Sequence, residues 1–160
     1  MLYTYHYHAS IGTLEIKEEN EHITGVRLLT EKEKVAESEF QSPLTPLLQQ
    51  AHHQLTEYFF GIRTTFDLPI AYPHGTTFQH AVWNALRSIP YGETRSYEDI
   101  ARAIGNPKAV RAIGQANTRN PILLLVPCHR VINKNGTIGG FGCGVEVKRK
   151  LLQLEGVNIK

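Results

Sequence analysis

The sequence contains few cysteines and no long hydrophobic run. Cys128 and Cys143 are the only two cysteines among 160 residues, too few for a disulfide framework or a cysteine-rich zinc site. No apolar stretch is long enough to span a bilayer, and the first residues lack the basic-then-apolar pattern of a secretory signal. We therefore expect a cytoplasmic protein in a reducing compartment, without membrane association.

Net charge is also small, at +2, but its distribution is uneven. Residues 1–75 carry five Lys/Arg and ten Asp/Glu, a net charge of −5, whereas residues 76–160 carry twelve and five, a net charge of +7. This asymmetry predicts two units, of which the second is attracted to a polyanion. Such splits also arise by drift in ordinary two-domain proteins, so the charge supports nucleic-acid binding without proving it.

The first half has the pattern of a small α+β domain, residues 1–75. Short β-rich segments predict strands over 2–9, 13–18 and 22–29, and the charged segment 31–41 predicts a surface loop. A capping hydroxyl followed by proline, Ser42-Pro43, predicts the start of a long helix that ends near Gly61. Apolar residues then recur along one helical face. Nothing in this half has the pattern of a catalytic site.

Six of the eight histidines lie in this first half. His6 and His8 share one face of the expected strand, which is an arrangement that can bind a metal. No cysteine or carboxylate accompanies them at a ligand spacing, so we interpret them as surface residues and expect no metal site.

The second half, residues 76–160, is predicted to be mostly helical. Thr76 and Gln79 have the spacing of a capping box, and Ser96 and Asp99 repeat it. A third helix is predicted from about Pro107 to Thr118, directly after a glycine-containing turn. Two short helices joined in this way are a helix-turn-helix candidate. The expected fold is therefore α+β with two domains.

The third helix separates its faces. Lys108, Arg111 and Gln115 lie on one side, with the small residues Ala109 and Ala112 beside them. Helices that recognise base edges carry longer polar side chains, whereas alanines let the backbone approach a narrow minor groove. A merely solvated helix face is the alternative, and the basic charge of this half favours DNA contact.

A reactive cysteine is predicted at the centre of this half. Five apolar residues, 122–126, predict a short buried segment that ends at Pro127. Cys128 follows, beside His129 and Arg130. Cationic neighbours favour the thiolate, which is the nucleophilic form. A buried structural cysteine is the alternative.

The chain then ends in a glycine-rich loop and a last helix. Residues 137–144 lack the Gly-Lys-Ser/Thr ending of a phosphate loop. Val147, Leu151 and Leu154 predict the apolar stripe of a final helix that Gly156 closes, with Glu155 at its end.

These motifs, in order and with their spacing, resemble the O6-alkylguanine-DNA alkyltransferases over residues 76–157. The resemblance rests on Phe78-Gln79, Val82-Trp83, Ile89-Pro90-Tyr91-Gly92, Ser96-Tyr97, Gly105-Asn106-Pro107-Lys108-Ala109-Val110-Arg111, Asn120-Pro121, Pro127-Cys128-His129-Arg130-Val131, Gly139-Gly140-Phe141 and Leu151-Leu152 with Glu155. It implies a DNA repair protein that moves an alkyl group from O6 of guanine, or O4 of thymine, to its own cysteine. Transfer would be stoichiometric, without a cofactor, and performed by a monomer on a flipped nucleotide in double-stranded DNA bound through the minor groove.

The resemblance also implies roles for individual residues. Cys128 would accept the alkyl group, and His129, oriented by Glu155, would take its proton through a water. Asn120 would brace the active-site turn. Tyr97 would press the adjacent phosphate and donate a proton toward the departing guanine.

Other residues would bind DNA and the extruded base. Arg111 would enter the duplex in place of the flipped nucleotide. Further DNA contacts are expected from Tyr97, Lys108, Ala109, Ala112, Gln115 and Arg130. The base would lie against Val131, Phe141 and Gly142.

Two positions depart from the family pattern, and three other functions compete. Gly142 stands where many members have serine or alanine, so it offers no side-chain donor to the base. Cys143 follows it, and we interpret it as a packing residue.

A lesion sensor without an acceptor thiol is disfavoured by Cys128. A helix-turn-helix regulator responding to alkylation is disfavoured by the alanine-rich helix, and a cysteine hydrolase leaves that helix unexplained.

Overall fold

A computed structural model describes residues 1–36 and 43–159. The chain divides into two compact units. Unit 1 comprises Met1–Pro73 together with Pro121–Leu123, and unit 2 comprises His74–Asn120 and the chain from Leu124 onward. The α+β fold class is confirmed, with a small antiparallel sheet and long helix in unit 1 and mainly helices in unit 2.

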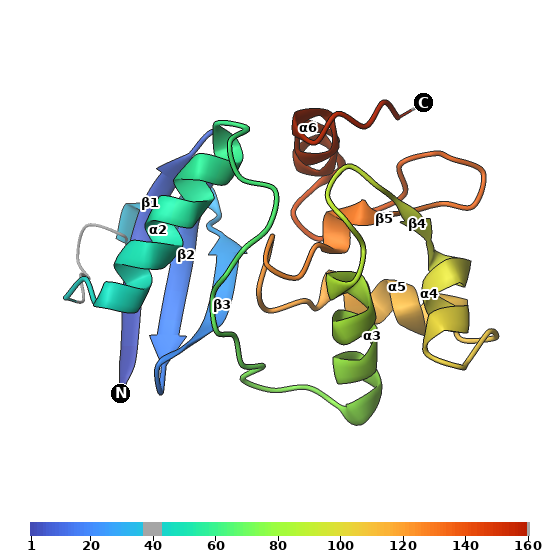
Figure 1. The fold of residues 1–160 in the computed structure, drawn as a ribbon, viewed down its shortest axis with the longest axis horizontal. Helices are drawn as coiled ribbons and strands as arrows, with labels where there is room; N and C mark the ends of the chain where they lie inside the picture. The colour runs from blue at the N-terminus through green and yellow to red at the C-terminus, as the bar shows by residue number, and fades with distance from the viewer. Residues whose placement is uncertain (37–42, 160) are drawn as a thin grey trace. The chain divides into compact units, whose positions relative to one another are not determined.

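Unit 1 is built on a three-stranded antiparallel sheet (Figure 1). Its strands are β1 (Leu2–Ala9), β2 (Gly12–Glu19) and β3 (His22–Leu28), paired in chain order. The second hairpin turns at Asn20 and Glu21, whose φ angles of 53° and 62° lie in the left-handed region. Two such residues form the turn whose twist matches the flanking strands.

Helix α2 (Pro46–Phe59) covers one face of this sheet (Figure 1). The Thr45 side chain caps it by accepting from the Leu48 backbone N–H, and Pro46 occupies the first turn. The helix therefore begins later than the Ser42-Pro43 signal predicted, because Thr45-Pro46 repeats that signal; Ser42 itself lies outside the described residues. The helix ends before Gly61, whose φ of 75° suits a residue after a helix.

The surface loop predicted over 31–41 is wrong at its start, where helix α1 (Glu31–Ala36) forms. Thr30 and Glu33 make a reciprocal cap: the Thr30 N–H donates to Glu33 Oε1, and the Glu33 N–H donates to Thr30 Oγ1. This is a capping-box pattern that the charged composition concealed. Residues 37–41 of the predicted loop lie outside the described part of the chain.

The core of unit 1 forms between the sheet and α2. Strand alternation places Leu14 and Ile16 on the buried face, and both are fully shielded from solvent. Leu48 and Leu55 of α2 are equally buried. The outer edge of β3 is also paired: Val26 forms a parallel bridge with Ile122.

The described residues of unit 2 form four α-helices, a short 3-10 helix and a two-stranded parallel pair of strands (Figure 1). The α-helices are α3 (Thr77–Arg87), α4 (Tyr97–Ala103), α5 (Val110–Thr118) and α6 (Val145–Leu154), with β4 (Arg95–Ser96) beside β5 (Val131–Ile132). Both predicted capping boxes are confirmed, at Thr76–Gln79 and at Ser96–Asp99. Helix α5 starts three residues after the predicted Pro107, because the Ala109 N–H bonds back to the Asn106 carbonyl and closes a turn first.

Trp83 is the largest fully buried side chain of the described residues. Its indole Nε1 donates to the Ala116 carbonyl at 2.9 Å, which fixes α3 to the last turn of α5. A buried indole normally finds such a partner. In the described part of the chain, no helix is both long and apolar enough to cross a membrane.

Candidate active site

Cys128 begins the short 3-10 helix η2 (Cys128–Arg130), directly after Pro127. Leu124, four residues before Cys128, has a φ of 74°, in the left-handed region that side chains other than glycine rarely adopt. The Cys128 N–H bonds to the Val126 carbonyl at 2.8 Å, and the Arg130 N–H bonds to the Pro127 carbonyl at 3.0 Å. The cysteine is only 3% exposed, so a tight, hydrogen-bonded turn presents a nearly buried thiol.

Asn120 braces this turn. Its Nδ2 atom donates to the Val126 carbonyl at 2.7 Å. Burial raises the pKa of the Cys128 thiol, and a side-chain hydrogen bond from Asn120 opposes that rise. The asparagine therefore acts on both the backbone and the sulfur of the turn.

His129 and Glu155 form a buried pair behind the cysteine. His129 Nε2 lies 2.6 Å from Glu155 Oε2. The carboxylate also accepts from Arg130 and from the Gly92 N–H, so it acts as an acceptor, and His129 must donate its Nε2–H. Burial lowers the pKa of His129, although Glu155 opposes that shift. The ring is therefore neutral at pH 7, and its Nδ1 lone pair can accept a proton.

Arg130 does not lie where the sequence placed it. It was expected among the DNA contacts, but it is 6% exposed, and its guanidinium donates to Glu155 and to the Ile89 carbonyl. A buried guanidinium needs such a counter-charge, and Glu155 is 25 residues away in the chain. We therefore no longer expect Arg130 to contact DNA.

The resting thiol is protonated. Burial raises the pKa of Cys128 to about 12, with the nearby Cys143 adding to the rise and Lys148 opposing it. The sequence suggested that cationic neighbours favour the thiolate. Instead His129 is neutral, and Glu155 neutralises Arg130. The proton must therefore leave during the reaction, and His129 is the adjacent base.

Lys148 is a site residue that the sequence argument missed. It is fully buried, its Nζ donates to the Gly140 carbonyl at 3.1 Å, and it lies 5.9 Å from the ring centroid of Tyr97 and 6.0 Å from that of Phe141. Burial lowers its pKa to about 8. The ammonium thus ties the glycine-rich loop to helix α6.

A signal for Lys148 was present in the sequence. Lys148, Leu151, Leu152 and Glu155 follow the i, i+3, i+4, i+7 spacing of one helical face, and all four are buried. The predicted stripe of Val147, Leu151 and Leu154 is therefore rotated, since only Leu151 of the three is buried. Two charged residues at core spacing on a terminal helix were the missed indication of a site.

Tyr97 and the glycine-rich loop lie close together. A Cβ atom added to Gly139 would stand 3.3 Å from the Tyr97 hydroxyl. Burial raises the pKa of Tyr97, and Cys128 adds to the rise, so the phenol keeps its proton. Gly142 packs on α5, where an added Cβ would lie 3.3 Å from Thr118. Val131 is fully buried in β5, whereas Phe141 is half-buried.

Helix α5 presents the residues expected to face DNA. Arg111 and Gln115 of the helix and Lys108 just before it are exposed, whereas Ala112 and the N-cap residue Ala109 are half-buried. Helix α4 ends at Ala103, and Gly105, with a φ of 77°, allows the sharp turn that follows it. The two helices pack against each other, as a helix-turn-helix requires.

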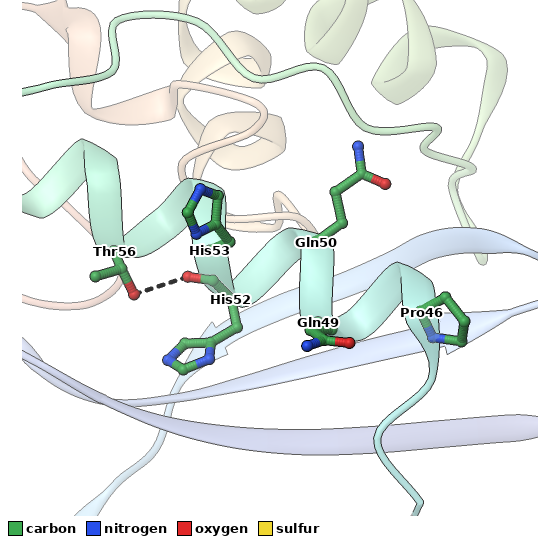
Figure 2. Close-up of a pocket in the computed structure, with 6 residues that line it drawn as sticks. All are labelled: Pro46, Gln49, Gln50, His52, His53 and Thr56. Atoms are coloured by element: carbon green, nitrogen blue, oxygen red, sulfur yellow. Dashed lines mark hydrogen bonds between the residues drawn. The ribbon is translucent and has the colours of Figure 1, made fainter.

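A shallow hollow lies along α2 of unit 1. Figure 2 shows the residues that line it, which are Pro46, Gln49, Gln50, His52, His53 and Thr56. Within this lining, the Thr56 hydroxyl donates a hydrogen bond to the His52 carbonyl. His6 pairs with Glu15, and His8 lies 3.0 Å from the Thr13 hydroxyl. Among the described residues, no three His, Cys, Asp or Glu side chains are grouped to hold a metal ion.

Comparison with known proteins matches both halves of the chain. The family model for the 6-O-methylguanine DNA methyltransferase DNA binding domain matches residues 77–157, and that for the ribonuclease-like domain of the same proteins matches residues 1–72. The constitutive methylated-DNA–protein-cysteine methyltransferase of Bacillus subtilis is 50% identical, covering 94% of this chain and 93% of its own. The Methanosarcina acetivorans enzyme of that name is 45% identical, with 94% and 96% covered.

A solved structure agrees with these matches. That of Mycobacterium tuberculosis OGT in complex with DNA superposes with a TM-score of 0.83 at 42% identity, covering 94% of this chain and 90% of that one.

Proposed function

Because this chain belongs to the 6-O-methylguanine DNA methyltransferase family, we propose that it repairs DNA by moving an alkyl group from O6-alkylguanine to Cys128. O4-alkylthymine is a second expected substrate. The observation that carries the proposal is the buried thiol of Cys128 beside the His129–Glu155 pair. Transfer is stoichiometric, because the thioether is not cleaved again.

The chemistry follows from these groups. The carbon on O6 is a soft electrophile that a sulfur nucleophile attacks well. A sulfur–carbon bond forms as the carbon–oxygen bond breaks. His129 takes the thiol proton through a water, held in position by Glu155, and Tyr97 supplies a proton to the departing guanine. Asn120 holds the turn that carries the nucleophile.

DNA binding is assigned to α5 and the residues around it. The alkylated oxygen lies inside the base stack, so the nucleotide must rotate out of the duplex. Arg111 fills the gap from the minor groove, and its exposure on α5 supports this role. Further contacts to DNA come from Tyr97, Lys108, Ala109, Ala112 and Gln115. The base lies against Val131, Phe141 and Gly142.

The remaining features are proposed on the same basis. Residues 1–75 form a structural domain, and residues 76–160 bind DNA and carry out the transfer. We propose that the protein acts as a monomer. We also propose that it acts in the cytoplasm, and the scarcity of cysteine supports such a reducing compartment.

The intact mass of the protein tests the proposed function. After mixing with a duplex that contains O6-methylguanine, we expect one added methyl group, about 14 Da, mapped to Cys128 by peptide analysis. The Cys143→Ser variant should gain the same mass, and the Cys128→Ala variant should gain none. Binding without a mass change would instead indicate a sensor or a regulator, and repeated turnover would indicate a hydrolase.

A further inference from the structure

Asn117 makes a contact with the nucleophile that no role above uses. It lies in the last turn of α5 and is 4% exposed. Its Nδ2 atom donates to the carbonyl of Cys128 at 3.2 Å. The preceding residue, Ala116, is held by the buried indole of Trp83, so the base of this side chain is rigidly placed. One side chain thus joins helix α5 to the peptide of the nucleophile.

The orientation of the amide follows from its partner. The carbonyl of Cys128 can only accept, so the NH2 group must face it, and the oxygen Oδ1 must point the other way. Oδ1 is buried and has no hydrogen-bond partner among the described residues. Buried acceptors of this kind are rare in folded proteins and commonly mark a functional position.

Only one other buried side-chain nitrogen or oxygen in the described chain lacks a partner, and it is Nδ1 of His129. His129 gives its Nε2–H to Glu155, so Nδ1 is also an acceptor. Both unpaired acceptors therefore belong to residues that are directly connected to Cys128. Asn117 is hydrogen-bonded to its carbonyl, and His129 follows it in the chain. In the proposed transfer a water carries the thiol proton, and its two hydrogens equal these two acceptors in number.

We propose that Asn117 is a positioning residue for alkyl transfer. Its NH2 group fixes the Cys128 carbonyl, and its Oδ1 shares with His129 the hydrogen bonds that orient the proton carrier beside the sulfur. The thiol proton leaves through that carrier to His129 as the sulfur attacks, and no bond to Asn117 is made or broken. This inference rests on the proposed function.

The test uses the full chain carrying Cys143→Ser and iodoacetamide, a small electrophile that needs no DNA. The alkylation rate of Cys128 is followed by intact mass as a function of pH, while circular dichroism confirms folding at each pH. Asn117→Leu keeps the volume but removes both polar groups. We expect it to slow alkylation roughly tenfold or more at every pH. Asn84→Leu and Asn84→Asp, on the exposed face of α3, are the matched controls.

Asn117→Asp provides the sharper readout. Burial raises the pKa of a carboxyl group, and the protonated acid offers one O–H donor and one acceptor, like the amide. Once ionised, it turns an oxygen toward the Cys128 carbonyl and opposes thiolate formation. We expect alkylation close to the wild-type rate at about pH 5.5 and at least roughly tenfold slower relative to wild type at about pH 8.5.

Two results would overturn the proposal. One is a folded Asn117→Leu protein that reacts within about twofold of Asn84→Leu at all pH values. The other is an Asn117→Asp protein whose rate relative to wild type does not change with pH. If Asn117→Leu does not fold, the aspartate variant decides alone. Wild-type transfer from DNA is measured separately, so loss of that activity and failure of this inference are distinguishable.

Discussion

Nε2 of His129 lies 2.6 Å from Oε2 of Glu155, and both side chains are completely shielded from solvent. The second oxygen of the same carboxylate lies 2.8 Å from Nε of Arg130. Glu155 therefore sets the tautomer of a base and neutralises a buried cation at once. A residue with these two tasks links the stability of unit 2 to its chemistry.

Replacing Glu155 with glutamine should affect both. The variant keeps the shape but leaves the Arg130 guanidinium buried without a counter-charge, which should lower the free energy of unfolding by about 3–5 kcal/mol. Urea unfolding measures this loss. Glu146→Gln, on the exposed start of the same helix, should change it little. Equal stabilities of the two variants would contradict the neutralising role of Glu155.

Arg111→Ala should separate duplex repair from reaction with the free base. Alkyl transfer from O6-methylguanine in duplex DNA should fall by at least roughly tenfold, because extrusion loses the side chain that fills the gap. Reaction with free O6-benzylguanine should persist. Single-turnover rates on both substrates give the ratio, and Arg102→Ala on neighbouring α4 is the control. Equal losses on both substrates would remove the flipping role.

Lys148→Met should change how stability depends on pH. Burial lowers the pKa of Lys148 from 10.5 to about 8. Between these values the unfolded chain binds more protons than the folded one, so the wild-type free energy of unfolding rises with pH there. The methionine variant lacks this contribution, so the difference between the two proteins should shift in favour of wild type above about pH 8.

Urea unfolding at several pH values checks this prediction. Both proteins should carry Cys128→Ser, so that titration of the thiol does not overlap with that of the lysine. Parallel stability curves for the two proteins would mean that Lys148 keeps an ordinary pKa.

Trp83→Phe should destabilise unit 2 without altering its surface. The change removes the indole donor, while the Ala116 carbonyl still accepts from the Arg119 N–H. Loss of this one hydrogen bond should lower the free energy of unfolding by about 0.5–1.5 kcal/mol, apart from the lost volume. Urea unfolding followed by circular dichroism measures it. Phe60→Leu replaces the aromatic ring of a residue that is 76% exposed, so it should have almost no effect on the free energy of unfolding. A similar loss in both variants would argue against the indole contact.

Local patterns in the sequence determined much of the fold. The capping boxes at Thr76 and Ser96 and the alternation in the strands involve residues only a few positions apart, so each acts wherever the rest of the chain lies. The order Pro127-Cys128-His129 also set the place of the turn and the chemical type of its nucleophile. The cap of α1 at Thr30 and Glu33 is equally local, but the charged composition of this segment is also typical of a surface loop, so composition alone does not predict the helix.

Only the tertiary structure decided how the charges at the site are used. Arg130 is turned inward and His129 stays neutral because Glu155 arrives from the end of α6, and the buried environment keeps the Cys128 thiol protonated. Asn117 reaches the Cys128 carbonyl in the same way, from another helix. Burial and ion pairing depend on which distant segments meet, and a residue's neighbours in the sequence do not contain that information.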